Sequence, residues 1–144
     1  PIGGGSGAAG MCLAAKARNP DIEVIGVQSA SAPAAWRAWH ERRLDIDAET
    51  STPHEGMATR VPFEMTMEIL WQQLDDFILV EDAEIDSAIR LLAQEVRVVA
   101  EGAGAASLAA AVKLRDRLAT RRVCGVLSGG NLPLDRYADV LRGA

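Results

Sequence analysis

The sequence predicts an α/β fold with a mostly parallel sheet flanked by helices. Short apolar runs rich in β-branched residues alternate with segments of helical character, which is the order of strand–helix–strand units. The chain also opens with a glycine-rich stretch, PIGGGSGAAG, that leads directly into an alanine-rich segment. Its 144 residues are enough for one domain with a buried core.

The opening glycine stretch is the feature around which the rest of the chain is organised. Glycines this dense allow positive φ angles and bring several backbone N–H groups to one point. We expect a helix over residues 8–17, and a glycine loop before a helix N-terminus favours anion binding. A phosphate site at residues 3–7 is therefore expected, with a plain glycine-rich turn as the alternative.

The next elements are a strand, a helix and a long loop. Residues 22–27 (IEVIGV) are apolar and β-branched, and we expect a buried strand there. A helix is expected over 34–43, where the spacing of Trp36 and Trp39 puts both on one face and favours core packing. Residues 44–60 are polar and irregular, and loops of this length are often functional.

The middle of the chain predicts a second helix–strand–helix unit. Pro62 is suited to the first position of a helix over 62–74, and residues 77–80 form the next strand candidate. A helix over 82–100 follows, with Asp82 as its N-cap. One apolar stripe runs along that helix: Ile85, Ile89, Leu92 and Val96.

The C-terminal third predicts a further helix, a third strand and a last helix. An alanine-rich helix is expected over 101–118, a buried strand over 123–127 (VCGVL) and a short helix over 135–141. A second glycine loop, SGGN at 128–131, follows the third strand. Ligands of parallel sheets gather at the C-terminal ends of strands, so both glycine loops are expected to face one ligand.

Composition and charge limit the function classes. The formal net charge of −5 argues against nucleic acid or an anionic membrane as a partner. Cys12 and Cys124 stand alone, without metal-type spacing, as is typical of a reducing compartment. We find no signal peptide and no apolar run that could span a bilayer, and we expect a cytoplasmic protein.

A dinucleotide is the first ligand to consider, because residues 5–10 satisfy the spacing G-x-G-x-x-G before a helix. The acidic residue expected after the following strand, which would hold a ribose, is absent, and Gln28 and Ser29 stand there instead. The dinucleotide hypothesis also leaves the second glycine loop without a role. A nucleotide-dependent oxidoreductase therefore stays as a secondary alternative.

Three motifs together point elsewhere: GGGSG at 3–7, EGAGA at 101–105 and SGGN at 128–131. In this order and spacing they resemble the fold-type II pyridoxal-phosphate enzymes, above all the threonine/serine dehydratases and serine racemase. Residues 26–29, 55–58 and 80–85 are also similar to family segments. The resemblance extends over essentially all 144 residues, but over only about the second half of a family member.

The resemblance implies a tryptophan synthase β-like fold, of which this chain would be part of a doubly wound sheet. Residues 1–144 would be the C-terminal part of the large cofactor-binding domain of a longer chain. The implied activity is pyridoxal 5'-phosphate-dependent β-elimination, which converts L-threonine or L-serine to a 2-oxo acid and ammonia. Amino-acid racemisation, elimination from a hydroxyaspartate and a non-catalytic binding partner remain alternatives.

The resemblance also implies which residues contact the cofactor. The loop formed by Gly3, Gly4, Gly5, Ser6 and Gly7 would bind its phosphate, and Ser128 would hydrogen-bond the pyridine nitrogen. A hydroxyl is a neutral partner, so the ring need not carry a proton there.

Two further residues are implied by the same family segments. Glu101 would lie near the ring and Gly56 would line the pocket. The plain alternatives are a turn residue at Ser128 and a dipole-favoured acid at Glu101.

Two departures from the family pattern affect the chemistry. Relatives that bind a divalent cation have acidic residues where Gln28 and Ala34 stand, so we expect no metal site. The family's Schiff-base lysine is missing, because Lys16 and Lys113 have neither its position nor its serine-flanked setting. We expect it in an N-terminal half outside this chain, which alone would not be catalytic.

The remaining expectations concern partners and the two histidines. An amino-acid substrate, that N-terminal half and a homo-oligomeric assembly are the expected partners. His40 and His54 match no catalytic position of the family, and we expect both on the surface.

Overall fold

A computed structural model describes residues 1–143 and has an α/β architecture built on a parallel pair of strands. Strand β1 (Ile25–Ser29) pairs with β2 (Asp76–Val80), with Ile25 opposite Asp76 and Ser29 opposite Val80. The backbone N–H of Ile2 donates to the carbonyl oxygen of Val27 at 2.8 Å, which joins the start of the chain to β1. The predicted fold class is confirmed.

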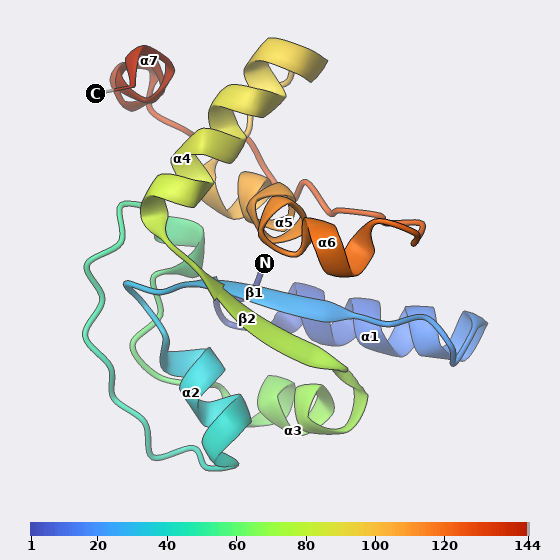
Figure 1. Ribbon diagram of the computed structural model, residues 1–144. Coiled ribbons are helices and arrows are strands. Elements are labelled where there is room, and N and C mark those ends of the chain that lie inside the picture. Colours follow the sequence, from blue (N-terminus) through green and yellow to red (C-terminus); the bar gives the residue numbers. More distant parts are fainter. Residues whose placement is uncertain (144) are drawn as a thin grey trace.

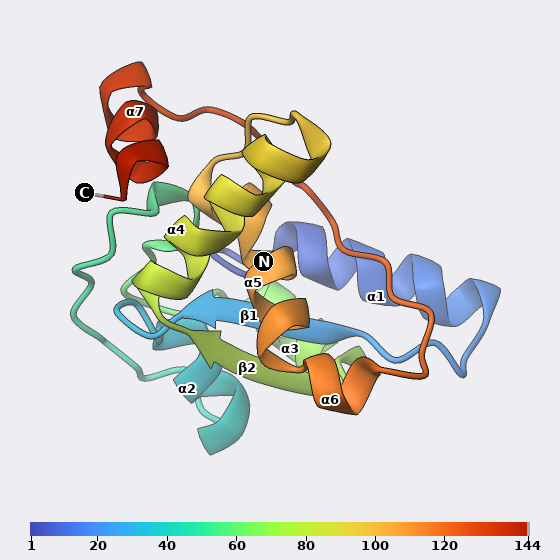
Figure 2. The same ribbon diagram turned by 45° about the horizontal axis from the view of Figure 1, so that its top comes forward.

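Helices cover both faces of the strand pair, as Figures 1 and 2 show from two directions. On one face α1, α2 and α3 pack together, and on the other α4 and α5 pack against each other, with α5 also touching both strands. Their bounds are α1 Ser6–Arg18, α2 Ala34–Glu41, α3 Glu64–Gln73, α4 Asp82–Leu91, α5 Gly102–Lys113, α6 Arg115–Leu118 and α7 Leu134–Arg142. Two short turns complete the chain: the 3₁₀ turn η1 (Glu55–Met57) and the π turn η2 (Leu92–Val96).

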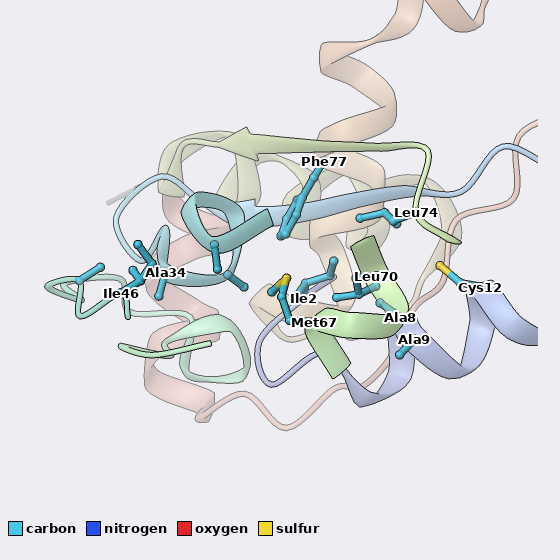
Figure 3. Packing of buried hydrophobic residues seen from close by; sticks show 13 residues of the cluster. Ile2, Ala8, Ala9, Cys12, Ala34, Ile46, Met67, Leu70, Leu74 and Phe77 are labelled. Carbon is cyan, nitrogen blue, oxygen red and sulfur yellow. The ribbon is translucent and has the colours of Figure 1, made fainter. Parts of the chain in front are cut away.

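Each face of the strand pair has its own apolar cluster. Between the strands and α1–α3, Phe77 is buried together with Ile2, Met67 and Leu70. Figure 3 shows Met67 and Leu70 of α3 beside Ile2 and Ala8, at the base of the glycine loop. Burying one such side chain stabilises a fold by about 1.5–3 kcal/mol, so this cluster firmly anchors the segment that precedes the loop.

The second cluster lies between the strands and α4–α5. Its largest members are Met57, Ile85, Ile89, Val27 and Val80. The small side chains of α5, a run of alanines and glycines, let this helix approach β1 and β2 closely. The two clusters together hold the ends of both strands, and the loops that follow them, in fixed positions.

The two tryptophans of α2 pack as expected. The indole Nε1–H of Trp36 donates to the carbonyl oxygen of Phe77 at 2.9 Å, and that of Trp39 donates to Leu70 at 3.1 Å. The rings therefore fasten α2 to β2 and α3 and are not a platform for a ligand. His40 stacks edge-on against both indoles.

Residues 123–127 do not form the expected strand. Val123 is 53% exposed and Leu127 is 42% exposed, and neither lies in a ladder. Within residues 1–143, the one hydrogen bond made by this stretch is from the Ser107 hydroxyl to the carbonyl oxygen of Val126. A strand exists through its hydrogen bonds to a neighbour, and no neighbouring strand lies beside this stretch in the described chain.

The boundaries of several other elements also differ from expectation; the helix expected from Pro62, for example, begins at Glu64. The first strand begins at Ile25 and contains Gln28 and Ser29, both fully buried, rather than ending before them. The helix expected over 82–100 ends as an α-helix at Leu91, and Val96, expected in its apolar stripe, is 59% exposed.

The N-terminus of α4 is capped by a residue other than the expected one. Glu81, not Asp82, is the N-cap, because Glu81 forms a reciprocal capping box with Glu84. The carboxylate of Asp82 instead accepts hydrogen bonds from the hydroxyls of Ser29 and Thr52. No helix of residues 1–143 is long and apolar enough to cross a membrane.

Candidate functional site

The glycine loop forms the start of α1 with a cluster of unused backbone donors. Gly5 caps the helix at φ 87°, a left-handed conformation that glycine adopts without strain. Among residues 1–143, no hydrogen bond uses the backbone N–H groups of residues 3–8. Free N–H groups at the positive end of a helix dipole are what a phosphate binds.

The carbonyl side of the same loop, in contrast, is held by two threonines. The hydroxyl of Thr66, in α3, donates to the carbonyl oxygen of Gly4 at 2.8 Å. The hydroxyl of Thr59 lies 3.5 Å from the carbonyl oxygen of Gly3, which makes a weaker contact. The sequence did not predict a role for either threonine, because each is distant from the loop along the chain.

Gly56 connects the glycine loop to the start of α5. A Cβ on Gly3 would collide with the carbonyl oxygen of Gly56, so the two backbones touch. A Cβ on Gly56 would lie 2.8 Å from the Cβ of Ala103, in the first turn of α5. Three segments that are far apart in sequence therefore meet at the N-terminus of α5.

Glu101 and the second glycine loop meet at the same helix terminus. Glu101 is the N-cap of α5, and its backbone N–H donates to the carbonyl oxygen of Gly129 at 3.1 Å. A Cβ on Gly104 would collide with that same oxygen, so the SGGN loop lies directly on the first turn of α5. Ser128 is exposed, and within the described chain its hydroxyl makes no hydrogen bond.

A polar cavity of about 370 Å³ opens beside this helix terminus. Its lining includes Gly56 and Glu101, together with Asn131 from the second glycine loop and Arg136 from α7. The structure thus brings Gly3, Gly56, Glu101 and the neighbour of Ser128 around one helix end. Between the glycine loop and Ser128 themselves, no hydrogen bond occurs within residues 1–143.

The expectation that His54 lies on the surface is wrong. His54 is 3% exposed and packs so closely on Gly102 that a Cβ there would collide with its ring. Its Nε2 lies 3.4 Å from the carbonyl oxygen of Asp82 and 3.8 Å from Oδ1 of Asp86. A lone histidine in a polar loop gives no sequence signal of such burial.

Asp82 is the centre of the network beneath His54. The hydroxyls of Ser29 and Thr52 donate to its Oδ1 at 2.6 and 2.7 Å. Burial by itself would raise the pKa of Asp82, but these hydrogen bonds outweigh burial and the pKa lies below its ordinary value. The network joins β1, the long loop and α4, and His54 above it lines the cavity.

Gln28 occupies the position that the family pattern associates with a cation. Its amide is fully buried: Oε1 accepts from the backbone N–H of Trp36 at 3.0 Å, and Nε2 lies 3.4 Å from the hydroxyl of Thr59. The amide thus bridges α2 and the long loop by itself. Within residues 1–143, no group of three acidic, histidine or cysteine side chains is placed to hold a metal ion.

Both lysines are engaged in ion pairs away from the glycine loop. Lys16 Nζ lies 2.7 Å from Oδ2 of Asp75, near the end of α1. Lys113 Nζ lies 2.9 Å from Oε2 of Glu84, near the end of α5. Neither amine belongs to the cluster of predicted site residues.

Comparison with known proteins gives this geometry a chemical context. The sequence pattern described as pyridoxal-phosphate dependent enzyme matches residues 1–129. The chain belongs to this family. The match includes the glycine loop, Gly56, Glu101 and Ser128, which are the residues gathered around α1 and α5.

Within this family, the chain is similar to enzymes named for threonine or serine. The chain is 37% identical to a catabolic L-threonine dehydratase of Staphylococcus aureus over 98% of its own length and 42% of that protein. It superposes on the T.th. threonine deaminase with a TM-score of 0.83 and 31% identity, over 93% of this chain and 49% of that one. It superposes on the serine racemase of Dictyostelium discoideum with a TM-score of 0.83 and 29% identity, over 93% and 43%.

This family member thus spans less than half the length of the curated relatives it matches. Its glycine loop fits the phosphate of the family's cofactor on structural grounds. The N–H groups of residues 3–8 are unused, the carbonyl groups are turned to Thr59 and Thr66, and no side chain but that of Ser6 stands on residues 3–7.

Proposed function

We propose that this chain forms the phosphate- and ring-binding part of a pyridoxal-phosphate-dependent dehydratase. The substrate is L-threonine or L-serine, and the products are a 2-oxo acid and ammonia. The observation that carries the proposal is the cluster of unused N–H groups over residues 3–8, in a chain of a phosphate-cofactor family. The choice of substrate is supported by 37% identity to a protein named L-threonine dehydratase.

In this proposal the predicted residues fall into two groups, one for the phosphate of the cofactor and one for its ring. Gly3, Gly4, Gly5, Ser6 and Gly7 bind the phosphate through backbone N–H groups, with the Ser6 hydroxyl as an additional donor.

The remaining residues face the rest of the cofactor. Ser128 bonds the pyridine nitrogen, Glu101 lies near the ring, and Gly56 lines the pocket. The exposed, unpartnered hydroxyl of Ser128 and the cavity at Gly56 and Glu101 are consistent with these tasks.

The neutral hydroxyl at Ser128 determines which reaction is favoured. When bound, the cofactor supplies an electron sink for the charge left at Cα after proton removal. A hydroxyl, unlike a carboxylate, does not hold a proton on the ring nitrogen, so the sink is weaker. A weaker sink favours rapid departure of a β-hydroxyl over transamination.

We further propose that the reactive amine comes from outside residues 1–144. Lys16 and Lys113 are paired with carboxylates away from the glycine loop. The active protein would then be a longer chain, in which these residues are the C-terminal part of the large domain. A homo-oligomeric state is part of the proposal. A cytoplasmic location is also part of it, and Cys12 and Cys124 are both free thiols.

The proposal is tested by intact mass, cofactor absorbance and product analysis on the purified protein. We expect a mass above that of the 144 residues, a bound-cofactor absorbance band that borohydride removes, and 2-oxo acid formed from L-threonine. A protein that takes up no pyridoxal phosphate would contradict the proposal.

One substitution tests the role of Ser128. We expect Ser128→Ala to lower turnover by up to about tenfold, the worth of one hydrogen bond to the ring. Ser87→Ala on α4 is the matched control and should leave turnover unchanged. Equal turnover of wild type and Ser128→Ala would refute the assignment of Ser128.

Racemisation is the second candidate, favoured by 29% identity to a serine racemase. Chiral analysis of the serine that remains after incubation separates the two reactions. A dehydratase leaves L-serine and accumulates 2-oxo acid, whereas a racemase accumulates D-serine.

A further inference from the structure

Thr66, in the first turn of α3, reaches the glycine loop with its hydroxyl. Its Oγ1 lies 2.8 Å from the carbonyl oxygen of Gly4 and 3.1 Å from that of Phe63. A hydroxyl has one hydrogen, and bonds of this type are shortest at about 2.7–2.8 Å. The stronger bond is therefore the one to Gly4.

This bond sets the direction of the peptide unit between Gly4 and Gly5. The unit is planar and trans, so its C=O and its N–H point in opposite directions. Because the carbonyl of Gly4 is held towards α3, the N–H of Gly5 is turned away from α3. It is one of the N–H groups that no hydrogen bond uses within residues 1–143.

The contact is close, and it restricts the backbone of the loop. A Cβ on Gly5 would lie 2.8 Å from Oγ1 of Thr66, so the threonine packs directly on this glycine. Glycine has the largest backbone freedom of any residue, and two adjacent glycines allow their shared peptide unit to rotate. A hydrogen bond to the carbonyl removes that freedom before a ligand arrives.

A second, weaker contact acts on the preceding peptide unit. The hydroxyl of Thr59 lies 3.5 Å from the carbonyl oxygen of Gly3, with the buried amide of Gln28 behind it at 3.4 Å. By the same geometry this contact turns the N–H of Gly4 away from Thr59. At these distances it contributes less than the bond from Thr66.

We propose that Thr66 is a positioning residue for phosphate recognition. Its hydroxyl holds the glycine loop so that the N–H of Gly5 is aimed at the phosphate of the bound cofactor. The inference rests on the proposed function, because it takes that phosphate as the anion. In this role Thr66 acts through the carbonyl group of Gly4.

The test compares two ligands that differ only in the phosphate. Dissociation constants of pyridoxal phosphate and of pyridoxal are measured for wild type, Thr66→Val and Thr66→Ser. Valine keeps the shape of threonine without the hydroxyl, and serine keeps the hydroxyl. We expect Thr66→Val to weaken pyridoxal phosphate binding by about three- to tenfold and pyridoxal binding by less than about twofold.

One further readout and one control variant separate positioning from general stability. The phosphorus-31 resonance of bound pyridoxal phosphate should shift in Thr66→Val and return in Thr66→Ser. Ser87→Ala is the matched control. The Ser87 hydroxyl also donates to a backbone carbonyl oxygen at 2.8 Å, that of Ala83, but both residues lie in α4 and not in α3. This variant should change neither dissociation constant.

Each other outcome overturns a stated claim. Equal weakening of both ligands in Thr66→Val would mean a structural role only, and no change in either would mean no role. If Thr66→Val does not fold, Thr66→Ala against Thr66→Ser gives the same comparison. Failure of wild type to bind pyridoxal phosphate would instead refute the proposed function itself, and this inference with it.

Discussion

Gly104 offers a direct test of how closely the second glycine loop packs on α5. The residue lies in the first turn of the helix, where alanine is ordinarily the better helix former by up to about 1 kcal/mol. A Cβ at this position, however, would collide with the carbonyl oxygen of Gly129 and lie 3.3 Å from the Gly129 nitrogen. Gly104→Ala therefore sets a local helix gain against a tertiary clash.

The clash outweighs the gain when the separate terms are compared. Inserting a methyl group against packed backbone costs about 1–3 kcal/mol. Moving Gly129 away also lengthens the 3.1 Å hydrogen bond from the Glu101 N–H, which is worth about 1 kcal/mol. After subtracting the helix gain, we expect Gly104→Ala to lower the free energy of unfolding by about 1–3 kcal/mol.

Thermal unfolding followed by circular dichroism measures this effect. For a domain of this size the expected fall in midpoint is about 3–10 °C. Gly10→Ala in α1 is the matched control, because a Cβ there meets nothing within 4 Å. We expect it to raise the midpoint by about 3 °C through helix propensity alone. A rise of the same size in Gly104→Ala would refute the packing of the loop on α5.

Three further substitutions test acid stability and cofactor binding. The folded-state pKa of Asp82 is lowered, so its stabilising contribution is present above the unfolded value of about 3.9 and is lost as pH falls through the folded value. We therefore expect wild type to lose more stability than Asp82→Asn between neutral and strongly acid pH; parallel curves of unfolding midpoint against pH would contradict this. For the cofactor, Ser6→Ala should weaken binding by about two- to fivefold, the worth of one exposed hydroxyl donor. Lys16→Ala should leave it unchanged, because Lys16 pairs with Asp75, and cofactor loss from that variant on dialysis would argue against these roles.

Local sequence patterns were sufficient for most of the secondary structure. The helix after the glycine loop, the helix with the paired tryptophans and the strand before Asp82 all follow from periodicity and composition over a few residues. The family resemblance likewise depended on short motifs read in order. The structure bears out the fold class for the same reason, since strand–helix alternation is a property of neighbouring residues.

The interpretation of 123–127 as a strand was wrong because a strand is not a local property. Its apolar, β-branched sequence satisfies the strand pattern, yet its backbone has no ladder partner within the described residues. The prediction that the helix after Asp82 continues to residue 100 was wrong for a related reason. Its apolar stripe was correct for Ile85 and Ile89, but Val96 meets no core and stays exposed.

The candidate site shows the same division between local and distant interactions. The glycine loop, Glu101 and Ser128 were predicted from the sequence, because glycine density and motif order are visible along the chain. The burial of His54 and the bond from Thr66 to Gly4 were not, because they join residues that are far apart in sequence.

The sequence by itself therefore determined the fold class, the family and most of the elements, and it supplied the candidate site residues. Only the tertiary structure decided which side chains orient those residues. The physical reason is that propensity and periodicity act over one or two turns, whereas a hydrogen bond such as the one from Thr66 to Gly4 forms only after α3 has packed against α1.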